Sequence, residues 1–399
     1  MAFGQTTVQT QQVCWPALTI NFTDTDMFAM MLIGSSISAL AQDDAPAMDA
    51  VSPADIQDVF VEITPDQPDG EAIINGDSAA EDDYPMTGGM LMSGVIFGYA
   101  FDTLVCSSTL IAPDVVLIAA HCLDEFAFTF GLSEIEDKQI WWTRQADLTE
   151  WDGQTRNPDL PADAVEMSGY VIHEDFDIQQ MQIGIAENHD IALLFLSEAL
   201  TDVPIAYLPT ADEATQIAEG DAVAVVGWGQ QVATGAQEAP PSGTYAIKMQ
   251  GESYISELGP MEFQVGLLED DVRKCHGDSG GPSFVDVVTD STETMRLIGV
   301  TSHAYDMTDC NETGGVDTRV DAYLEWIDDQ MVAACDDGTR VWCDDVTGIL
   351  PPPEPALAGD TGDGKDGGKG CSALGGSAGA GLALLASGML GLRRRQGMV

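Results

Sequence analysis

The chain has 399 residues, 45% of them hydrophobic, which is enough apolar material to bury one large core or two modest ones. Sixty-six acidic residues face 14 basic ones, so the formal net charge is -52. A surface this negative argues against nucleic acid as a partner, because it would repel phosphate groups.

The N-terminal region contains two segments of different composition. A run of apolar and small residues begins at Met27 and ends in an Ala-x-Ala pattern at Ala41, which predicts a signal peptide in residues 1–41 with Met27 as an alternative start. No lysine or arginine precedes Lys138, so a buried strand or helix remains the alternative interpretation. Residues 42–72 are acidic and rich in proline, which predicts a propeptide or spacer.

Residues 73–334 have the pattern of an all-β barrel or sandwich. Their apolar runs are short, rich in valine and isoleucine, and separated by turn-forming residues. Strands are predicted at Leu104–Ala120, Ala222–Trp228 and Leu297–Ser302. A closing helix is predicted from apolar residues at helical spacing, namely Val320, Tyr323, Leu324, Ile327 and Met331. The acidic stretch Trp141–Glu187 predicts surface loops, and both a solvated loop and a calcium site remain open there.

The C-terminal region divides into a linker and a tail. Residues 335–370 are rich in proline, glycine and aspartate, and the spacing of Cys335 and Cys343 at the start of this linker predicts a local disulfide. Residues 371–399 begin with Cys371, continue through a 20-residue apolar stretch and end in an arginine cluster. This tail is long enough to span a bilayer, and it is the part of the chain predicted to contact a membrane.

Three short motifs together carry the chemistry of a hydrolase. The stretch Cys275–Pro282 places Ser279 between glycines, which allow a sharp turn and bring backbone N–H groups close to a reacting carbonyl. A serine needs a base to become a good nucleophile, and His121 in the motif Ala119–Cys122 offers one. Asp190, followed by an apolar run, offers a buried carboxylate that would orient the histidine.

These motifs, in the order His121, Asp190 and Ser279, resemble the trypsin/chymotrypsin family of serine endopeptidases over residues 73–334. The resemblance implies two six-stranded antiparallel β-barrels with a C-terminal helix and an active site between the barrels. It also implies an oxyanion hole made by the N–H groups of Gly277 and Ser279, protein or peptide substrates, and catalysis with no cofactor and no metal.

The resemblance further implies how the domain is activated and cross-linked. A protease would cut before Ile73, and the new amino group would pair with Asp278. Disulfides would join Cys106 to Cys122 and Cys275 to Cys310. The absence of Cys-x-x-Cys pairs in the chain favours such disulfides, and hence an oxidising compartment, over a zinc site.

Substrate preference depends on the residues that the resemblance assigns to the specificity pocket. Arg273, six residues before the nucleophile, and Lys274 would favour an acidic substrate side chain. In the competing interpretation Asp317 pairs with Arg273 and neutralises the pocket floor. The remaining predicted pocket residues are Ser302, His303, Ala304 and Gly315.

The tail resembles the C-terminal sorting signals of surface proteins in myxobacteria and related Gram-negative bacteria. This resemblance implies that a sorting peptidase acts near Cys371 and that the protein is secreted and anchored at the cell surface. A permanent membrane anchor is the alternative. A second function also remains open for the whole chain, namely a non-catalytic adhesion or interaction module on the same fold.

Overall fold

The computed structural model describes residues 73–349, apart from positions 97, 130, 152–156, 233–240, 269, 290, 307–309, 311–312 and 344–347. Contacts divide the chain into two units, 1–351 and 352–399, and every described residue belongs to the first. The predicted signal peptide, the propeptide, the tail with Cys371 and most of the linker therefore lie outside the described residues.

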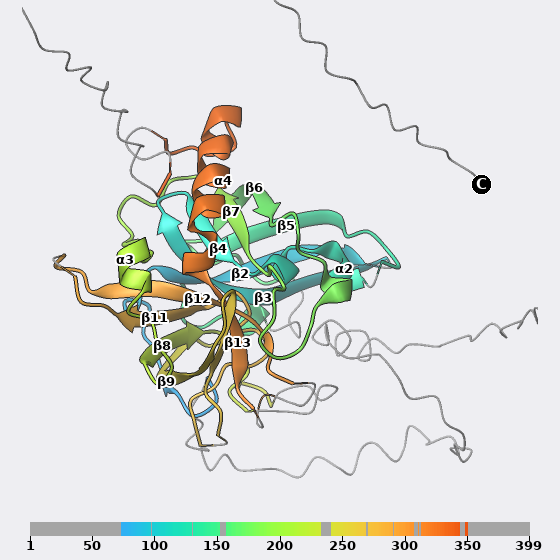
Figure 1. Ribbon diagram of the computed structural model, residues 1–399. Coiled ribbons are helices and arrows are strands. Elements are labelled where there is room, and N and C mark those ends of the chain that lie inside the picture. The colour runs from blue at the N-terminus through green and yellow to red at the C-terminus, as the bar shows by residue number, and fades with distance from the viewer. Residues whose placement is uncertain are drawn as a thin grey trace, which may run out of the picture. The chain divides into compact units, whose positions relative to one another are not determined.

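The first half of the domain is a closed six-stranded antiparallel barrel (Figure 1). Its strands lie in the order β2-β3-β4-β7-β6-β5. Their bounds are β2 Thr87–Ile96, β3 Tyr99–Ala112, β4 Val115–Ile118, β5 Glu136–Thr143, β6 Val165–Ile172 and β7 Ala192–Leu196. Strands β4 and β7 pair with each other and are buried along their whole length, which explains their continuous apolar sequences.

The second half is another antiparallel barrel, in which the ring β8-β9-β10-β13-β12-β11 closes through the pairing of β11 with β8. A short strand β1 adds to the edge of β9. The bounds are β1 Asp77–Ser78, β8 Ala222–Gly227, β9 Met249–Leu258, β10 Glu262–Val265, β11 Pro282–Asp286, β12 Met295–Ala304 and β13 Gly315–Arg319. The predicted pair of six-stranded barrels is confirmed.

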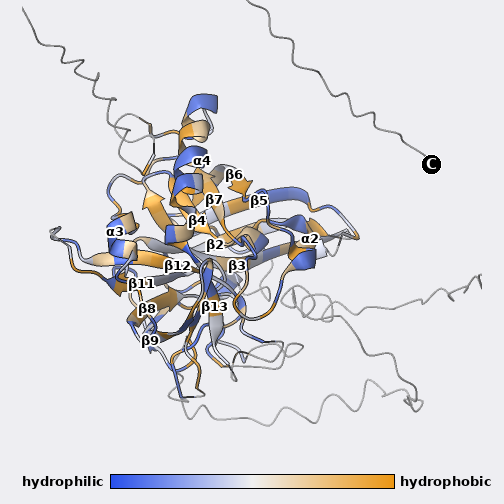
Figure 2. Cartoon of the chain, in the orientation of Figure 1, coloured by the Kyte–Doolittle hydropathy of each residue, from blue (hydrophilic) through white to orange (hydrophobic). Residues whose placement is uncertain are grey.

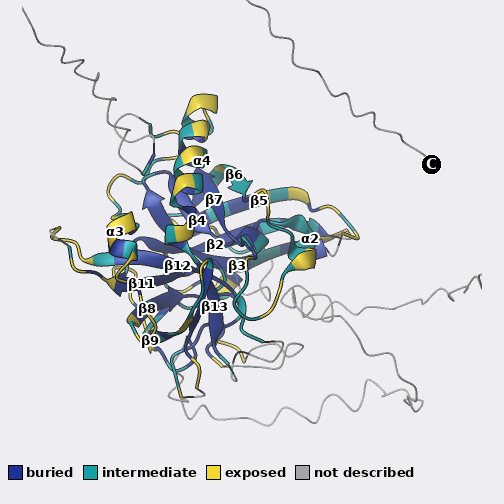
Figure 3. Cartoon of the chain, viewed as in Figure 1, coloured by how far each residue is buried: buried dark blue, intermediate teal, exposed yellow. Residues whose placement is uncertain are grey.

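A helix closes the domain, as predicted. The 3-10 turn η4 (Val320–Tyr323) leads into α4 (Leu324–Asp337), which packs its apolar residues Ile327, Met331 and Ala334 against the first-barrel core. Figure 3 shows the opposite face of α4 exposed to solvent. Gly338 ends the helix in the left-handed conformation that favours glycine. The helix therefore continues three residues beyond the domain boundary predicted at Ala334.

Two predictions from apolar runs need correction. The run Leu104–Ala120 is not one strand, because a turn at Pro113 and Asp114 separates β3 from β4. The acidic stretch Trp141–Glu187 is not only surface loop, because it contains β6, which the first barrel needs in order to close. Apolar residues along the strands of both barrels form the interior (Figure 2), whereas the remaining short elements lie in the connections between strands. These short elements are η1 Ala120–Cys122, α2 Glu125–Thr129, η2 Thr149–Trp151, η3 Ile178–Gln180 and α3 Ala211–Ala214.

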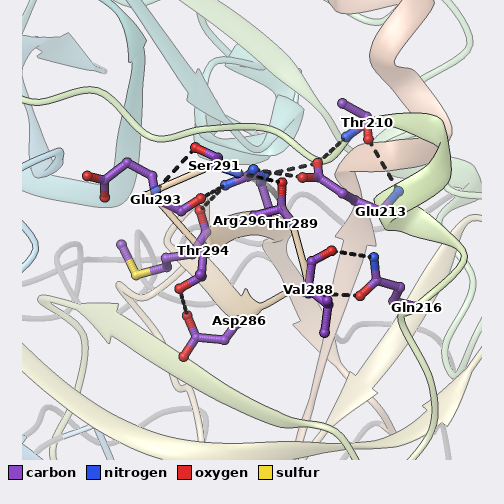
Figure 4. A network of polar contacts seen from close by, with 11 residues as sticks. Thr210, Glu213, Gln216, Asp286, Val288, Thr289, Ser291, Glu293, Thr294 and Arg296 are labelled. Atoms are coloured by element: carbon purple, nitrogen blue, oxygen red, sulfur yellow. Dashed lines mark hydrogen bonds and ion pairs between the residues drawn. The ribbon is translucent and has the colours of Figure 1, made fainter.

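A buried ion pair attaches α3 to the second barrel (Figure 4). Arg296 on β12 donates through Nη2 and Nε to the carboxylate of Glu213, over 2.7 and 3.0 Å. Thr210 caps the same helix by accepting from the backbone N–H of Glu213, and Glu213 accepts from the backbone N–H of Thr210. The hydrogen bonds from Arg296 are the main cause that lowers the pKa of Glu213 to about 2.

All three predicted disulfides are present: Cys106–Cys122, Cys275–Cys310 and Cys335–Cys343. The first lies beside His121 and the second lies in the segment that leads to Ser279. None of the helices in the described part of the chain is both long and apolar enough to cross a lipid bilayer.

Candidate active site

His121 and Asp190 lie at the same edge of two paired antiparallel strands. His121 lies in the 3-10 turn η1 just after β4, and Asp190 lies just before β7, which pairs with β4. The carboxylate of Asp190 accepts hydrogen bonds from the backbone N–H and the ring Nδ1 of His121, at 2.9 and 2.7 Å. Because these two bonds fix the position and tautomer of the ring, Nε2 is left as the proton acceptor.

The electrostatics of this pair favour a charged aspartate beside a basic histidine. Burial alone would lower the pKa of His121, but the charge of Asp190 and its hydrogen bond raise that pKa above the ordinary histidine value. Burial alone would raise the pKa of Asp190, but the charge and hydrogen bonds of His121 and a hydrogen bond from Ser302 lower it. Both shifts favour the ion pair, although the His121 side chain is still 19% exposed and open to a substrate.

Further hydrogen bonds surround Asp190. The hydroxyl of Ser302 donates to Oδ2 at 2.6 Å, and the hydroxyl of Thr318 donates to the Asp190 carbonyl at 3.0 Å. The ring of His303 connects Ser302 Oγ, at 2.9 Å, with the carbonyl of Gly184, at 3.1 Å. Strands β12 and β13 therefore hold Asp190 from the side of the second barrel. The role of Thr318 was not predicted from the sequence, because an isolated threonine gives no signal.

Ser279 lies in a tight loop in which glycine is required. Gly277 has a φ of +94°, and a Cβ there would come within 2.5 Å of the Tyr245 ring. Gly280 has a φ of +77°, and a Cβ there would come within 2.5 Å of the Ser107 carbonyl oxygen. Within the described part of the chain, the N–H groups of Gly277 and Ser279 donate to no other group, so both remain available to an oxyanion.

The hydroxyl of Ser279 is not hydrogen-bonded to His121 in this structure. The other described contact of the His121 ring is between Nε2 and the sulfur of Cys122, at 3.8 Å. A free serine rotates about a single bond, and such contacts commonly tighten only when substrate binds. A Cβ at Gly280, the residue after Ser279, would lie 3.1 Å from the backbone nitrogen of Ala119, so the Ser279 loop lies beside the segment that leads to His121.

Ser107, at 0% exposure, joins the first barrel to the Ser279 loop. Its backbone N–H donates to the carbonyl of Ser279 at 2.9 Å, and its hydroxyl donates to the carbonyl of Gly277 at 2.9 Å. The same hydroxyl accepts from the backbone N–H of Trp228 at 2.9 Å. The role of Ser107 was not predicted from the sequence, since only the tertiary structure brings β3 and the Ser279 loop together.

Asp278 is buried beneath this loop, where its carboxylate accepts from the backbone N–H groups of Cys275 and Gly229, both at 2.9 Å. Burial is the main cause that raises its pKa to about 6. Ile73 is also buried, within the core of the second barrel, and the carbonyl of Ile74 accepts from the N–H of Arg273 at 3.0 Å. The start of the domain is thus already attached to the segment that leads to Ser279.

The predicted specificity pocket differs from both expectations. Arg273 is completely buried, and its Nε donates to the carbonyl of Asp271 at 3.3 Å. The partner of Asp317 is Lys274 rather than Arg273, with Nζ to Oδ2 at 2.7 Å and to Oδ1 at 2.9 Å. The expected Arg273–Asp317 pair is therefore wrong, because the backbone of this segment directs Lys274, and not Arg273, toward Asp317. Gly315 and Ala304 lie opposite each other on β13 and β12.

Potential metal ligands lie close together in two groups of described residues. One group is Cys106, His121 and Cys122, and the other is Cys275, His276 and Cys310. All four cysteines are in disulfides, so their sulfurs are not available as thiolate ligands.

Comparison with known proteins agrees with this geometry. The family model for trypsin matches residues 73–327, which is more than half of the chain. The chain belongs to the trypsin family of serine endopeptidases. The match begins at the residue predicted as the start of the mature domain and ends within α4.

Relatives in the trypsin family are distant. The chain is 27% identical over 268 residues to a trypsin of Saccharopolyspora erythraea, covering 65% of this chain and 99% of that protein. It is 26% identical over 286 residues to the transmembrane protease serine 5 of Homo sapiens, covering 66% of this chain but 52% of that protein. It is also 26% identical over 233 residues to the vitellin-degrading protease of Bombyx mori, covering 57% of this chain and 76% of that protein. The chain thus spans about half the length of the human relative and nearly all of the bacterial trypsin.

Proposed function

We propose that the protein hydrolyses peptide bonds with Ser279 as nucleophile, His121 as general base and Asp190 as the group that orients His121. The observation that carries this proposal is the double hydrogen bond from His121 to Asp190, at 2.9 and 2.7 Å, which leaves Nε2 to accept a proton. A surface histidine without this partner would have neither a fixed tautomer nor a raised pKa.

The reaction proceeds in two steps. Ser279 Oγ attacks the scissile carbonyl while His121 Nε2 takes its proton, and the oxyanion accepts from the N–H groups of Gly277 and Ser279. His121 then gives the proton to the leaving amine, which departs and leaves an acyl-enzyme. Water, activated by the same histidine, attacks the acyl group and regenerates Ser279.

Activation by cleavage before Ile73 is part of this proposal. The carboxylate of Asp278 is buried with two backbone donors, and its raised pKa means that a positive charge beside it would be stabilising. The amino group of Ile73 would supply that charge after the cut. Ile73 also has a φ of +39° in the uncleaved chain, which is unfavourable for a β-branched residue, so freeing its nitrogen would relieve strain.

Secretion and surface anchoring complete the proposal. Three disulfides in the described residues support an oxidising compartment outside the cytoplasm. The signal peptide, the propeptide, the linker and the sorting tail with Cys371 are proposed from sequence, because their defining residues lie outside the described part of the chain. A sorting peptidase and an activating protease are the partners that these segments require, and extracellular proteins or peptides are the substrates.

The experiment that tests catalysis is covalent labelling by a fluorophosphonate probe together with cleavage of a peptide library. Protein beginning at Ile73 should incorporate the probe and cleave peptides, whereas Ser279→Ala should do neither. His121→Ala should fold normally and lose at least about 1000-fold in kcat/KM. If the folded, mature protein neither incorporates the probe nor cleaves any peptide, the catalytic proposal fails and the non-catalytic interaction module is the better explanation.

A further inference from the structure

The hydroxyl of Ser302 lies between two hydrogen-bond partners but has a single proton. Ser302 is buried, and its Oγ lies 2.6 Å from Oδ2 of Asp190 and 2.9 Å from Nδ1 of His303. The pKa of Asp190 lies below its ordinary value, so this carboxylate is charged and can only accept a hydrogen bond. When Nδ1 of His303 has no proton, it is an acceptor too, and both groups then compete for one hydrogen.

The tautomer of His303 follows from the contact of its other ring nitrogen. Nε2 lies 3.1 Å from the carbonyl oxygen of Gly184, which has no proton to donate, so Nε2 must be the donor. This carbonyl is held in place because the N–H of Gly184 donates to the carbonyl of Tyr305 at 2.8 Å. A neutral His303 ring therefore has its proton on Nε2 and turns Nδ1, as an acceptor, toward Ser302.

The surroundings of His303 favour the neutral ring. Burial is the largest effect and lowers the pKa of His303, and the charge of a protonated His121 lowers it further. The hydrogen bond to the carbonyl and the charges of Asp190 and Asp317 oppose this effect, although Lys274 balances the charge of Asp317. The pKa of His303 lies below the ordinary histidine value, whereas the pKa of His121 lies above it. His303 is therefore neutral at a pH at which His121 can accept a proton.

We propose that His303 is a positioning residue for the His121–Asp190 pair and acts by competing with Asp190 for the hydroxyl proton of Ser302. The inference rests on the proposed proteolytic function, in which Asp190 orients His121. Asp190 is the closer acceptor and is charged, so it takes the larger share of the hydrogen bond. The share that His303 takes leaves more of the Asp190 charge to stabilise a protonated His121. His303 thus makes His121 a stronger base.

Protonation of His303 ends this competition. Nδ1 then carries a proton and donates to Ser302 Oγ, while Ser302 donates to Asp190 and Nε2 still donates to Gly184. Each group in the chain of hydrogen bonds has a partner in that state. The effect of His303 on His121 is therefore confined to the neutral form of the His303 ring.

A double-mutant cycle separates this effect from a general change in packing. His303→Phe removes the competing acceptor but keeps a flat ring, so Ser302 donates to Asp190 alone and the pKa of His121 should fall by roughly 0.5–1. In a Ser302→Ala background there is no hydroxyl to compete for. Adding His303→Phe there should change the pKa of His121 by less than about 0.3. A packing effect of the new ring would appear in both backgrounds.

The measurement is an NMR titration of the histidine rings in protein that begins at Ile73 and has the Ser279→Ala substitution. The chain has five histidines, and the loss of one signal in His121→Gln or in His303→Phe assigns each of these two rings. The same spectra should show His303 protonated on Nε2 and not on Nδ1 above pH 7. In protein that retains Ser279, the acid limb of kcat/KM should shift in His303→Phe by the same amount as the pKa of His121.

Two further variants complete the design. Tyr305→Phe is the matched control, because it removes a hydroxyl that donates to Glu257 at 2.8 Å and keeps the backbone carbonyl that accepts from Gly184. It should leave the pKa of His121 unchanged. His303→Leu also removes both ring nitrogens, so it should reproduce the shift if His303→Phe does not fold.

Three outcomes overturn the inference: folded His303 variants in which the pKa of His121 is unchanged or raised, an equal shift in the Ser302→Ala background, or a His303 ring that is protonated on Nδ1 above pH 7. Failure of the proposed catalysis looks different. In that case no peptide would be cut faster than by Ser279→Ala, although the titration would still report on His121. Cleavage that depends on Ser279, with no shift of the His121 pKa, would keep the triad and reject the role of His303.

Discussion

The segment after α4 is attached to the first barrel by a buried ion pair that can be tested directly. Asp114 lies in the turn between β3 and β4, and Arg340 lies beyond the helix, with both side chains at 0% exposure. Oδ1 of Asp114 accepts from Arg340 at 2.9 Å, and Oδ2 accepts from the backbone N–H groups of Val341 and Trp342 at 2.9 and 2.8 Å. Arg340 lies beyond residues 73–327, which match the trypsin family, whereas Asp114 lies within them.

Arg340→Met should strongly destabilise the domain. The substitution keeps much of the side-chain volume but leaves the Asp114 charge buried with only backbone donors. Removing one partner of a buried ion pair costs about 3–5 kcal/mol. In a domain of this size, 1 kcal/mol changes Tm by roughly 2–4 °C, so the melting temperature should fall by roughly 10 °C.

The matched control is Lys138→Met, which removes an ion pair with Glu125, whose side chain is 41% exposed. That loss should stay below about 1 kcal/mol. The double variant Asp114→Asn with Arg340→Met should be more stable than Arg340→Met alone, because no uncompensated charge remains buried. Thermal and urea unfolding with all disulfides oxidised measures these differences. If Arg340→Met were no more destabilised than Lys138→Met, Arg340 would not hold this segment in place.

Three further predictions concern the active site and its surroundings. Ser107→Ala removes the hydroxyl that bonds Gly277 and Trp228, so kcat per labelled Ser279 should fall roughly 10-fold. Ser108→Ala is its control, because that hydroxyl bonds Gly88 and Trp142 away from the Ser279 loop, and equal kcat values in the two variants would contradict the assignment. His121 must be neutral to accept a proton, and Asp190 raises the pKa of His121. The acid limb of the pH profile of kcat/KM should therefore have a pKa above the ordinary histidine value of about 6.5. An acid-limb pKa below that value would contradict the interaction between His121 and Asp190. Glu213→Gln should destabilise the protein at neutral pH by on the order of 2 kcal/mol. A lowered pKa of about 2 means that the contribution of Glu213 is complete above about 4.5 and is lost as the pH falls toward 2, so urea unfolding should show wild type and variant converging there.

Much of the fold was predictable because its signals are local. Short valine-rich runs between turn residues predicted β-structure, and apolar residues at helical spacing predicted α4. Local signals did not predict the turn at Asp114, which divides the apolar run Leu104–Ala120. The buried carboxylate of Asp114 accepts hydrogen bonds from residues more than 220 positions later in the chain, and a local pattern contains no information about these donors. The strand β6 was missed because its half-buried residues do not form a clear apolar run.

The candidate site was predictable where residue type and spacing alone suffice. Gly277 and Gly280 are recognisable because their backbone conformations and close neighbours exclude a side chain. His121 and Asp190 are recognisable because each adjoins a buried strand, and those two strands pair. The function of Ser107 was not predictable, because its hydroxyl meets residues 121 and 170 positions away.

Local motifs and periodic patterns in the sequence predicted the β-structure, the closing helix and the candidates for catalysis. The two-barrel architecture and the pairs Cys106–Cys122 and Cys275–Cys310 followed from the resemblance that these motifs carry. The partner of Asp317 could be identified only from the folded structure. Arg273 and Lys274 are adjacent in the chain and have the same charge, so composition cannot distinguish them, but the backbone of this segment directs Lys274 toward β13 and Arg273 toward Asp271. Side-chain direction is set by packing against distant strands, and the expected charge of the specificity pocket changes with it.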